Sequence, residues 1–236
     1  MLSQVAKFIN LYWIQILFTI LIGYILGSIN TPILLTKKIK NGADIRTMGS
    51  GNAGLTNVLR CNGKIPALLI ILIDISKVML AVTISGMAFS YLKLPGVSEF
   101  YIISLGKYLM GISCFLGHLY PCFFGFKGGK GVLFVIAMIF AVDFRVGFLL
   151  LFTFAIVVSI SKIVSLGSII AAALYPVFTF LITFYFDYTP NKSSINYVIL
   201  STILSFIIGL AVILKHKKNI IRLINKTEKK ISIKNK

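Results

Sequence analysis

Residues 65–91 read IPALLIILIDISKVMLAVTISGMAFSY, an apolar run whose only charged side chains are Asp74 and Lys77. A helix of about 20 such residues crosses the ~30 Å hydrocarbon core of a membrane. Similar runs recur along the 236 residues, of which 58% are hydrophobic and only 13% charged. Soluble domains carry roughly a quarter charged residues. The sequence therefore predicts an all-α integral membrane protein.

We predict seven transmembrane helices, and their ranges are 12–36, 65–91, 100–124, 131–144, 146–161, 165–187 and 195–214. The fourth and fifth are short and meet at Asp143-Phe144-Arg145. Since the apolar runs leave no room for a soluble domain, we expect one polytopic domain over 1–236. The first run is longer than the apolar core of a secretory signal, roughly 7–15 residues, and lacks a small-residue cleavage site, so we expect it to stay in the mature protein.

The net charge of +18 is concentrated in alternate loops. One side holds Lys37, Lys38, Lys40, Arg46, Arg60, Lys64, Lys127, Lys130, Lys162, Lys215, Lys217, Lys218, Arg222, Lys226, Lys229, Lys230, Lys234 and Lys236; the other holds Lys7, Lys93, Arg145 and Lys192. Cytoplasmic loops carry the Lys and Arg excess. We predict an outside N-terminus, a cytoplasmic C-terminus and attraction of the tail to anionic membrane lipids. No basic, aromatic-studded surface outside the membrane indicates nucleic-acid binding.

The loop Gly49-Ser50-Gly51-Asn52-Ala53-Gly54, flanked by Arg46 and Arg60, falls on the cytoplasmic side. Glycine N–H groups and two guanidiniums form a natural phosphate cradle. The spacing predicts a short helix from Ala53, capped by Ser50 or Asn52, with a phosphate at its N-terminus. The alternative is an ordinary turn between two spans. Neither GxxxxGK[ST] nor GxGxxG occurs, so nucleotide binding has no support.

Three further polar segments fall on the same predicted side. In the first, Pro121 should end the third span after His118. The glycine pair of Lys127-Gly128-Gly129-Lys130 should then let the two lysines face one site. The second is a hairpin at Ser161–Ser168. In the third, His216, Asn219 and Arg222 share one face of a helix that continues beyond the last span. Their simpler interpretations are a helix-end histidine, turns with interfacial lysines, and a solvated basic helix.

Other features narrow the chemistry. Asp74 and Lys77, one turn apart at membrane depth, should form an ion pair that also braces the site. Cys61, Cys114 and Cys122 lack metal-ligand spacing, so we expect packing roles. No metalloprotease motif or hydrolase triad occurs, and we expect no metal and no cofactor. Cations, glycine N–H groups and two histidines suit the transfer of a group between two phosphorylated molecules, with phosphate as the leaving group.

The chain resembles the bacterial acyl-phosphate:glycerol-3-phosphate acyltransferases, seven-span enzymes of the cytoplasmic (inner) membrane, over nearly its whole length. The matching segments are Gly27-Ser28-Ile29, Asp44-Ile45-Arg46, Gly49-Ser50-Gly51-Asn52, Thr56-Asn57-Val58, Arg60, Gly117-His118 through Gly131-Val132, Val164-Ser165-Leu166-Gly167-Ser168-Ile169, His216, Asn219-Ile220, Arg222-Leu223 and Glu228. Several ordered motifs at the family's spacing are far more specific than any one of them.

The resemblance implies that acyl phosphate donates a fatty acyl group to the 1-hydroxyl of sn-glycerol 3-phosphate, giving lysophosphatidic acid and phosphate. It implies active-site roles for Ser50, Arg60, Lys130, His216 and Asn219. For phosphate or substrate contacts we predict Arg46, Gly49, Gly51, Asn52, Asn57, His118, Lys127, Gly128 and Gly129. His216 could act as a base or only bind, since acyl phosphate is already activated. Docking of a soluble acyl-phosphate synthase on the tail stays open.

The chain departs from the family pattern at Asn30, Pro32, Leu55, Leu133, Phe134, Lys162 and Asn225. None of these replaces a predicted functional residue, but the bulkier Leu55, Leu133 and Phe134 leave acyl-chain preference open. A transporter of an organic phosphate is the main alternative. It would place binding groups near the bilayer midplane, often in inverted repeats, whereas these motifs lie on one face. A non-catalytic scaffold would explain the basic tail but not the glycine loop.

Overall fold

The computed structural model describes residues 2–190 and 193–230, which form helices and connecting loops without a strand. Lys192, Lys234 and Lys236 of the charge pattern lie outside these described residues. The chain divides into two compact units, Met1–Val142 and Asp143–Lys236. Six helices in the described part of the chain are long and apolar enough to cross a membrane. The protein is therefore an all-helical, multi-pass membrane protein.

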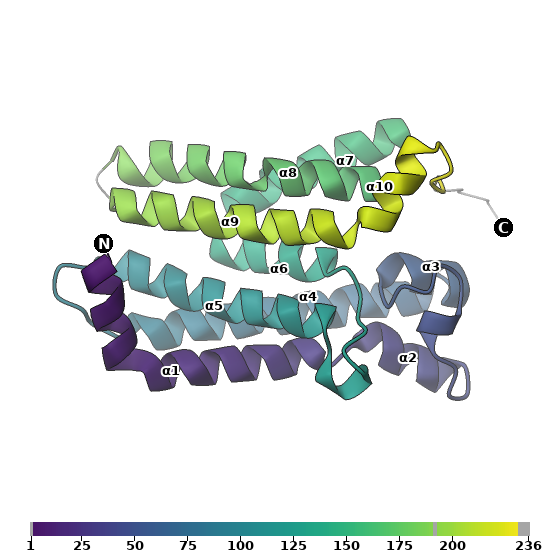
Figure 1. Ribbon diagram of the computed structural model, residues 1–236, viewed down its shortest axis with the longest axis horizontal. Helices are drawn as coiled ribbons and strands as arrows, with labels where there is room; N and C mark the ends of the chain where they lie inside the picture. The colour runs from purple at the N-terminus through teal and green to yellow at the C-terminus, as the bar shows by residue number, and fades with distance from the viewer. Residues whose placement is uncertain (1, 191–192, 231–236) are drawn as a thin grey trace. The chain divides into compact units, whose positions relative to one another are not determined.

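Unit 1 is built around three long helices, and α5 lies beside both α1 and α4 (Figure 1). Its elements are α1 (Leu2–Ser28), α2 (Thr31–Ile39), η1 (Ile45–Thr47), α3 (Leu55–Asn62), α4 (Lys64–Ser90), α5 (Glu99–Leu119), η2 (Cys122–Phe124) and α6 (Val132–Val142). Glycines allow α1 and α5 to touch, because a Cβ on Gly27 would collide with the Cys114 backbone and one on Gly117 with the Tyr24 carbonyl. This close contact fixes the helix ends that carry the polar loops.

The first predicted span is not one continuous helix. It breaks at Ile29 and Asn30, where α1 ends and α2 begins. The Asn30 side chain accepts a hydrogen bond from the Ile33 N–H at 3.2 Å, and Pro32 occupies the first turn of α2, where no N–H is needed. The predicted span over 12–36 lies within the apolar segment Ala6–Ile39, and Asn30 and Pro32 together form a helix-start signal inside it.

Unit 2 consists of α7 (Phe144–Ser161), α8 (Val164–Ile182), the π-helical η3 (Thr183–Tyr188), α9 (Ile195–Lys215) and α10 (Lys217–Ile224). The predicted hairpin before α8 is confirmed, with Lys162 in the left-handed region at φ 60°. Pro176 interrupts the hydrogen bonding of α8, and Gly209 of α9 packs on the Ala172 carbonyl that the proline leaves unpaired in the helix ladder. The helices α8 and α9 thus lie side by side (Figure 1).

Helices occupy all seven predicted ranges, but they differ in length. With 11 residues, α6 rises about 17 Å at 1.5 Å per residue. That is short of the ~30 Å hydrocarbon core. The boundary at Asp143 is confirmed, since α6 ends at Val142 and α7 begins at Phe144. Seven crossings, the orientation and the single domain remain predictions.

Candidate active site

One side chain, Asn57 of α3, holds the glycine loop of unit 1 in place. The buried Asn57 amide nitrogen donates to the carbonyls of Ile45 at 3.1 Å and Met48 at 3.0 Å. Its oxygen accepts the Ser50 N–H at 2.9 Å. All three bonds tie the loop to the helix that follows it. Asn57 therefore supports the loop rather than reaching outward to a ligand.

Two backbone donors of this loop are left available. Within the described residues, no hydrogen bond takes the N–H groups of Gly49 or Asn52, and neither residue is buried. Gly49 and Gly51 adopt φ values of +59° and +72°, which only glycine reaches without strain. Consecutive N–H groups in such a conformation form an anion-binding concavity. The backbone geometry thus suits a phosphate.

The helix after the loop begins later than the sequence predicts. It starts at Leu55 with Gly54 at the N-cap position, which has no side chain to cap it. The expectation that Ser50 or Asn52 caps a helix from Ala53 was wrong, because the helix begins at Leu55 and Gly54 takes the N-cap position. The first N–H groups of α3 thus receive no side-chain cap.

Arg46 joins this loop to the second polar segment. Its guanidinium binds Asp44 through Nε and Nη2, with Nη2–Oδ2 at 2.7 Å, and donates from Nη1 to the carbonyls of Phe124 at 2.6 Å and Lys127 at 3.0 Å. The hydrogen bond from the Arg46 side chain lowers the pKa of the Asp44 carboxyl despite its partial burial. Arg46 is thus an anchor between two loops, and its contacts favour a supporting role over direct phosphate binding.

The Lys127–Lys130 turn packs directly on the glycine loop. Pro121 ends α5 as predicted, and the N–H groups of Gly128 and Gly129 bond back to the carbonyls of Leu119 and His118 at 3.2 Å each. A Cβ on Gly129 would collide with both the Ala53 carbonyl and His118 Nε2. The glycine loop and the Lys127–Lys130 turn, far apart in the sequence, are therefore adjacent in unit 1.

The predicted ligand contacts differ in how accessible they are. His118 is only 4% exposed, and its ring lies 4.3 Å from the ring of Phe134, so the structure makes it a buttress of the turn. Ser50, Arg60 and Lys127 are exposed, and Lys130 is half-buried. Within the described residues, neither the Ser50 hydroxyl nor the Arg60 guanidinium has a hydrogen-bond or ion-pair partner. Ser50 and Arg60 are thus available to an anionic ligand.

The other two polar segments meet in unit 2 at Glu228. Its carboxylate accepts from Ser165 Oγ at 2.8 Å, Asn219 Nδ2 at 2.6 Å and Arg222 Nε at 2.6 Å. Burial raises the pKa of Glu228, but these hydrogen bonds outweigh it and hold the pKa below its usual value. The Ser161–Ser168 hairpin and the segment after α9 are therefore fastened together.

His216 lies at a break and not within a continuous helix. The helix α9 ends at Lys215 and α10 begins at Lys217, so the expectation that one helix continues past the last span was wrong. His216 Nδ1 lies 2.8 Å from the Val212 carbonyl, which can only accept, so Nδ1 carries a proton. In the neutral ring, Nε2 is then the nitrogen that can accept a proton.

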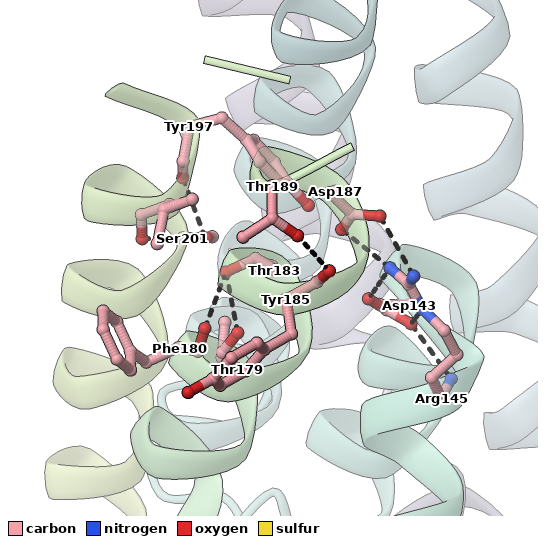
Figure 2. A network of polar contacts seen from close by, with 11 residues as sticks. Asp143, Arg145, Thr179, Phe180, Thr183, Tyr185, Asp187, Thr189, Tyr197 and Ser201 are labelled. Carbon is pink, nitrogen blue, oxygen red and sulfur yellow. Dashed lines mark hydrogen bonds and ion pairs between the residues drawn. The ribbon is translucent and has the colours of Figure 1, made fainter. Parts of the chain in front are cut away.

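Arg145 forms an ion-pair network in unit 2 that the sequence analysis missed (Figure 2). Its guanidinium binds Asp143 at 2.7 Å and both carboxylate oxygens of Asp187, at 3.0 and 2.8 Å. This links the start of α7 to η3. The signal was available, since the chain has only six acidic residues and Asp187 lies in an otherwise apolar run.

All six acidic side chains take part in ion pairs. Besides those of Arg145, the pairs are Asp44 with Arg46, Asp74 with Lys77, Glu99 with Lys93, and Glu228 with Arg222. Within the described residues, every acidic side chain thus has a cationic partner. In unit 1, the exposed cations and the backbone donors of the glycine loop can bind phosphorylated molecules and stabilise a developing oxyanion.

The departures from the family pattern have visible structural places. Leu55 and Leu133 both pack on the core cluster of Ile33, Ile45, Ala53, Val58 and Ile70, so they fill the interior beneath the glycine loop. Phe134, 1% exposed, lies between Lys77 and His118. The bulkier side chains of this protein are thus accommodated in its core.

Comparison with known proteins gives a consistent result. A family model described as glycerol-3-phosphate acyltransferase matches residues 17–226. Proteins named glycerol-3-phosphate acyltransferase are 41% identical in Prochlorococcus marinus (strain MIT 9515), over 92% of this chain and 98% of the relative, and 38% identical in Clostridioides difficile (strain 630), over 89% and 92%.

Solved structures agree with the sequence relatives. The glycerol 3-phosphate form of PlsY (YgiH), described as an integral membrane glycerol 3-phosphate acyltransferase, matches with a TM-score of 0.72 and 30% identity, over 92% of this chain and 96% of that one. The lysophosphatidic acid form of the same protein gives a TM-score of 0.71.

Proposed function

This chain belongs to the glycerol-3-phosphate acyltransferase family, and we propose that acyl phosphate is its acyl donor. The 1-hydroxyl oxygen of sn-glycerol 3-phosphate attacks the acyl carbon and forms the ester bond of lysophosphatidic acid. The bond between the acyl carbon and the bridging oxygen breaks, and that oxygen leaves with its electron pair as inorganic phosphate. The hydroxyl proton passes to His216 Nε2, to the leaving phosphate or to solvent.

The observation that supports this proposal most is the packing of the glycine loop on the Lys127–Lys130 turn. Both substrates carry a phosphate, and the loop offers the unbonded N–H groups of Gly49 and Asn52 together with the exposed Arg60. Backbone donors and guanidiniums bind phosphate oxygens with charge-assisted hydrogen bonds. A transporter has no need of such a fixed set at one end of its helices.

We assign catalytic roles to Ser50, Arg60, Lys130, His216 and Asn219. Arg60 and Lys130 neutralise the leaving phosphate, and Ser50 orients the donor with Asn52. Gly49, Gly51, Lys127, Gly128 and Gly129 contribute to binding, while Arg46, Asn57 and His118 hold these groups in place. His216 Nε2 either accepts the hydroxyl proton or binds substrate. Because acyl phosphate is already activated, correct positioning supplies much of the rate.

We further propose that the protein works in the bacterial cytoplasmic membrane with its N-terminus outside. The basic loops then face the cytoplasm. The membrane lipids receive the acylated product directly. The reaction requires no cofactor and no metal.

The proposal is tested with purified protein in detergent, given acyl phosphate and glycerol 3-phosphate. We expect lysophosphatidic acid and phosphate in equal amounts, and a loss of about 100-fold or more in rate for Arg60→Ala or Lys130→Ala. Lys38→Ala, an exposed lysine on α2 without an assigned role, should retain activity. No product, or full activity in Ser50→Ala and Lys130→Ala, would overturn the proposal. Counterflow of glycerol 3-phosphate in liposomes without product would favour a transporter.

A further inference from the structure

The Asp74–Lys77 ion pair is more deeply buried than the other ion pairs described in unit 1. It lies outside the phosphate cluster, by which we mean the glycine loop at 49–54 and the Lys127–Lys130 turn. Asp74 is 1% exposed, and its Oδ1 accepts from Lys77 Nζ at 3.1 Å and from Thr31 Oγ1 at 2.6 Å. Charges inside a membrane helix are costly and are retained where they do something. The proposed reaction does not use this pair.

One set of its contacts reaches the break between α1 and α2. Lys77 Nζ donates to the Ile29 carbonyl at 2.9 Å, and Thr31 binds Asp74. The carbonyl belongs to the end of α1, where the helix leaves it without an internal partner. The pair on α4 therefore fixes the point from which α2 departs. Ile33 of α2 packs with Ile45, Ala53 and Val58 in the core beneath the glycine loop.

The other contact reaches the lysine turn. Lys77 Nζ lies 4.9 Å from the centroid of the Phe134 ring, within the range of a cation–π interaction. The Phe134 ring lies 4.3 Å from that of His118, and His118 Nε2 touches the backbone of Gly129. A chain of packed groups therefore runs from the Lys77 ammonium through two rings to the Gly128–Gly129 turn.

We propose that Lys77, held by Asp74, is a positioning residue that sets the spacing between the glycine loop and the Lys127–Lys130 turn. Its ammonium donates a hydrogen bond to the Ile29 carbonyl at the start of the segment that supports the loop. It also lies against the Phe134 ring, which supports the turn through His118. The positions of the glycine loop and of the Lys127–Lys130 turn thus both depend on one atom, Lys77 Nζ. The inference rests on the proposed function, because that spacing matters only if a phosphate binds there.

The test removes both contacts of the Lys77 ammonium, to the Ile29 carbonyl and to the Phe134 ring, without leaving a buried charge unpaired. In Asp74→Asn/Lys77→Met, the asparagine oxygen still accepts from Thr31, while the bond to the Ile29 carbonyl and the cation–π contact are lost. Phe134→Leu removes only the ring on which Lys77 and His118 lie. The matched control is Glu99→Gln/Lys93→Met, which neutralises an exposed ion pair of the same 3.1 Å length.

We expect the KM for glycerol 3-phosphate to rise about tenfold in Asp74→Asn/Lys77→Met and in Phe134→Leu. The thermal midpoints of these variants should stay above the assay temperature, so that the proteins are folded when the KM is measured. The control variant should have the wild-type KM. In the triple variant the two effects should be less than additive, because both variants remove the contact between Lys77 and the Phe134 ring. A wild-type KM in folded Phe134→Leu, or fully additive effects, would overturn the positioning role. If the wild type itself gives no product, the proposed function fails instead, so the two failures are distinguishable.

Discussion

The side-chain oxygen of Asn57 accepts a hydrogen bond from the Ser50 N–H at 2.9 Å, so a buried helix residue fixes the middle of the glycine loop. The same amide binds two more loop carbonyls, those of Ile45 and Met48. Asn57 thereby decides where Ser50 and the unbonded N–H groups of the loop point. The loop is rigid at its centre because every hydrogen-bonding position of one side chain is used.

We expect Asn57→Ala to abolish this arrangement. It removes the side-chain donor from the Ile45 and Met48 carbonyls, which each keep one backbone N–H donor, and it leaves the Ser50 N–H without its acceptor, at a cost of about 1–3 kcal/mol. The rate should fall by about 100-fold, since small displacements of catalytic groups have effects of that size. Thermal unfolding and initial rates measure both effects. Asn62→Ala, which removes one bond from the same helix to Thr36, is the control and should keep most activity. Equal activity of the two variants would contradict the role of Asn57.

Gly49 should not tolerate a methyl group. Both Gly49 and Gly42 have positive φ values, +59° and +92°, so alanine is strained at either position, by about 1 kcal/mol. Only at Gly49 would the new Cβ collide with Asn57 and Cys61, whereas Gly42 has nothing within 4 Å. Gly49→Ala should therefore lose activity far beyond Gly42→Ala in the same assay. Similar losses at both positions would mean that backbone strain alone matters.

Glu228 should make the attachment of the C-terminal segment depend on pH. Its pKa is lowered in the folded protein, so its stabilising effect is complete above the ordinary glutamate value of 4.5 and is lost as the pH falls through the lowered value. Hydrogen exchange of residues 217–228 should increase across that acidic range. Glu228→Gln should exchange rapidly at every pH, and Glu99→Gln should behave like the wild type. A pH-independent wild type would exclude this role.

Arg145→Met should destabilise unit 2, because it leaves Asp143 and Asp187 facing each other without a cation (Figure 2). Breaking a buried pair costs roughly 3–5 kcal/mol, and the 30% exposure of the Arg145 side chain reduces this. Lys93→Met removes an exposed pair worth about 0–1 kcal/mol and serves as the control. The thermal midpoints should rank Arg145→Met clearly below Lys93→Met. Catalytic rates measured below both midpoints should remain close to the wild type.

The apolar runs were enough to predict the helices, because their length and lack of charge determine membrane helices directly. The Asp74–Lys77 pair and the Pro121 break were also predicted, since both follow from local spacing. The break at Asn30 was predictable in principle from its N-cap and proline signal. It was missed because hydrophobicity dominated the interpretation of that run.

The supporting residues could not be predicted in the same way. Arg46, Asn57 and His118 have the residue types of ligand contacts, and only tertiary structure reveals that their polar atoms or rings are committed to loop carbonyls, loop N–H groups and Phe134. Long-range pairs such as Arg145 with Asp187 cannot be predicted from local spacing in the sequence. Residue type therefore identified the cluster, and contacts separated its supports from its exposed groups.

The central claim is acyl transfer from acyl phosphate to glycerol 3-phosphate, and the fate of one oxygen tests it most directly. Acyl phosphate labelled with ¹⁸O at the bridging position is supplied with glycerol 3-phosphate, and both products are analysed by mass spectrometry and ³¹P NMR. Attack at the acyl carbon predicts that all the label leaves in inorganic phosphate and none enters lysophosphatidic acid. Label in the lipid product, or no lipid product at all, would contradict the account.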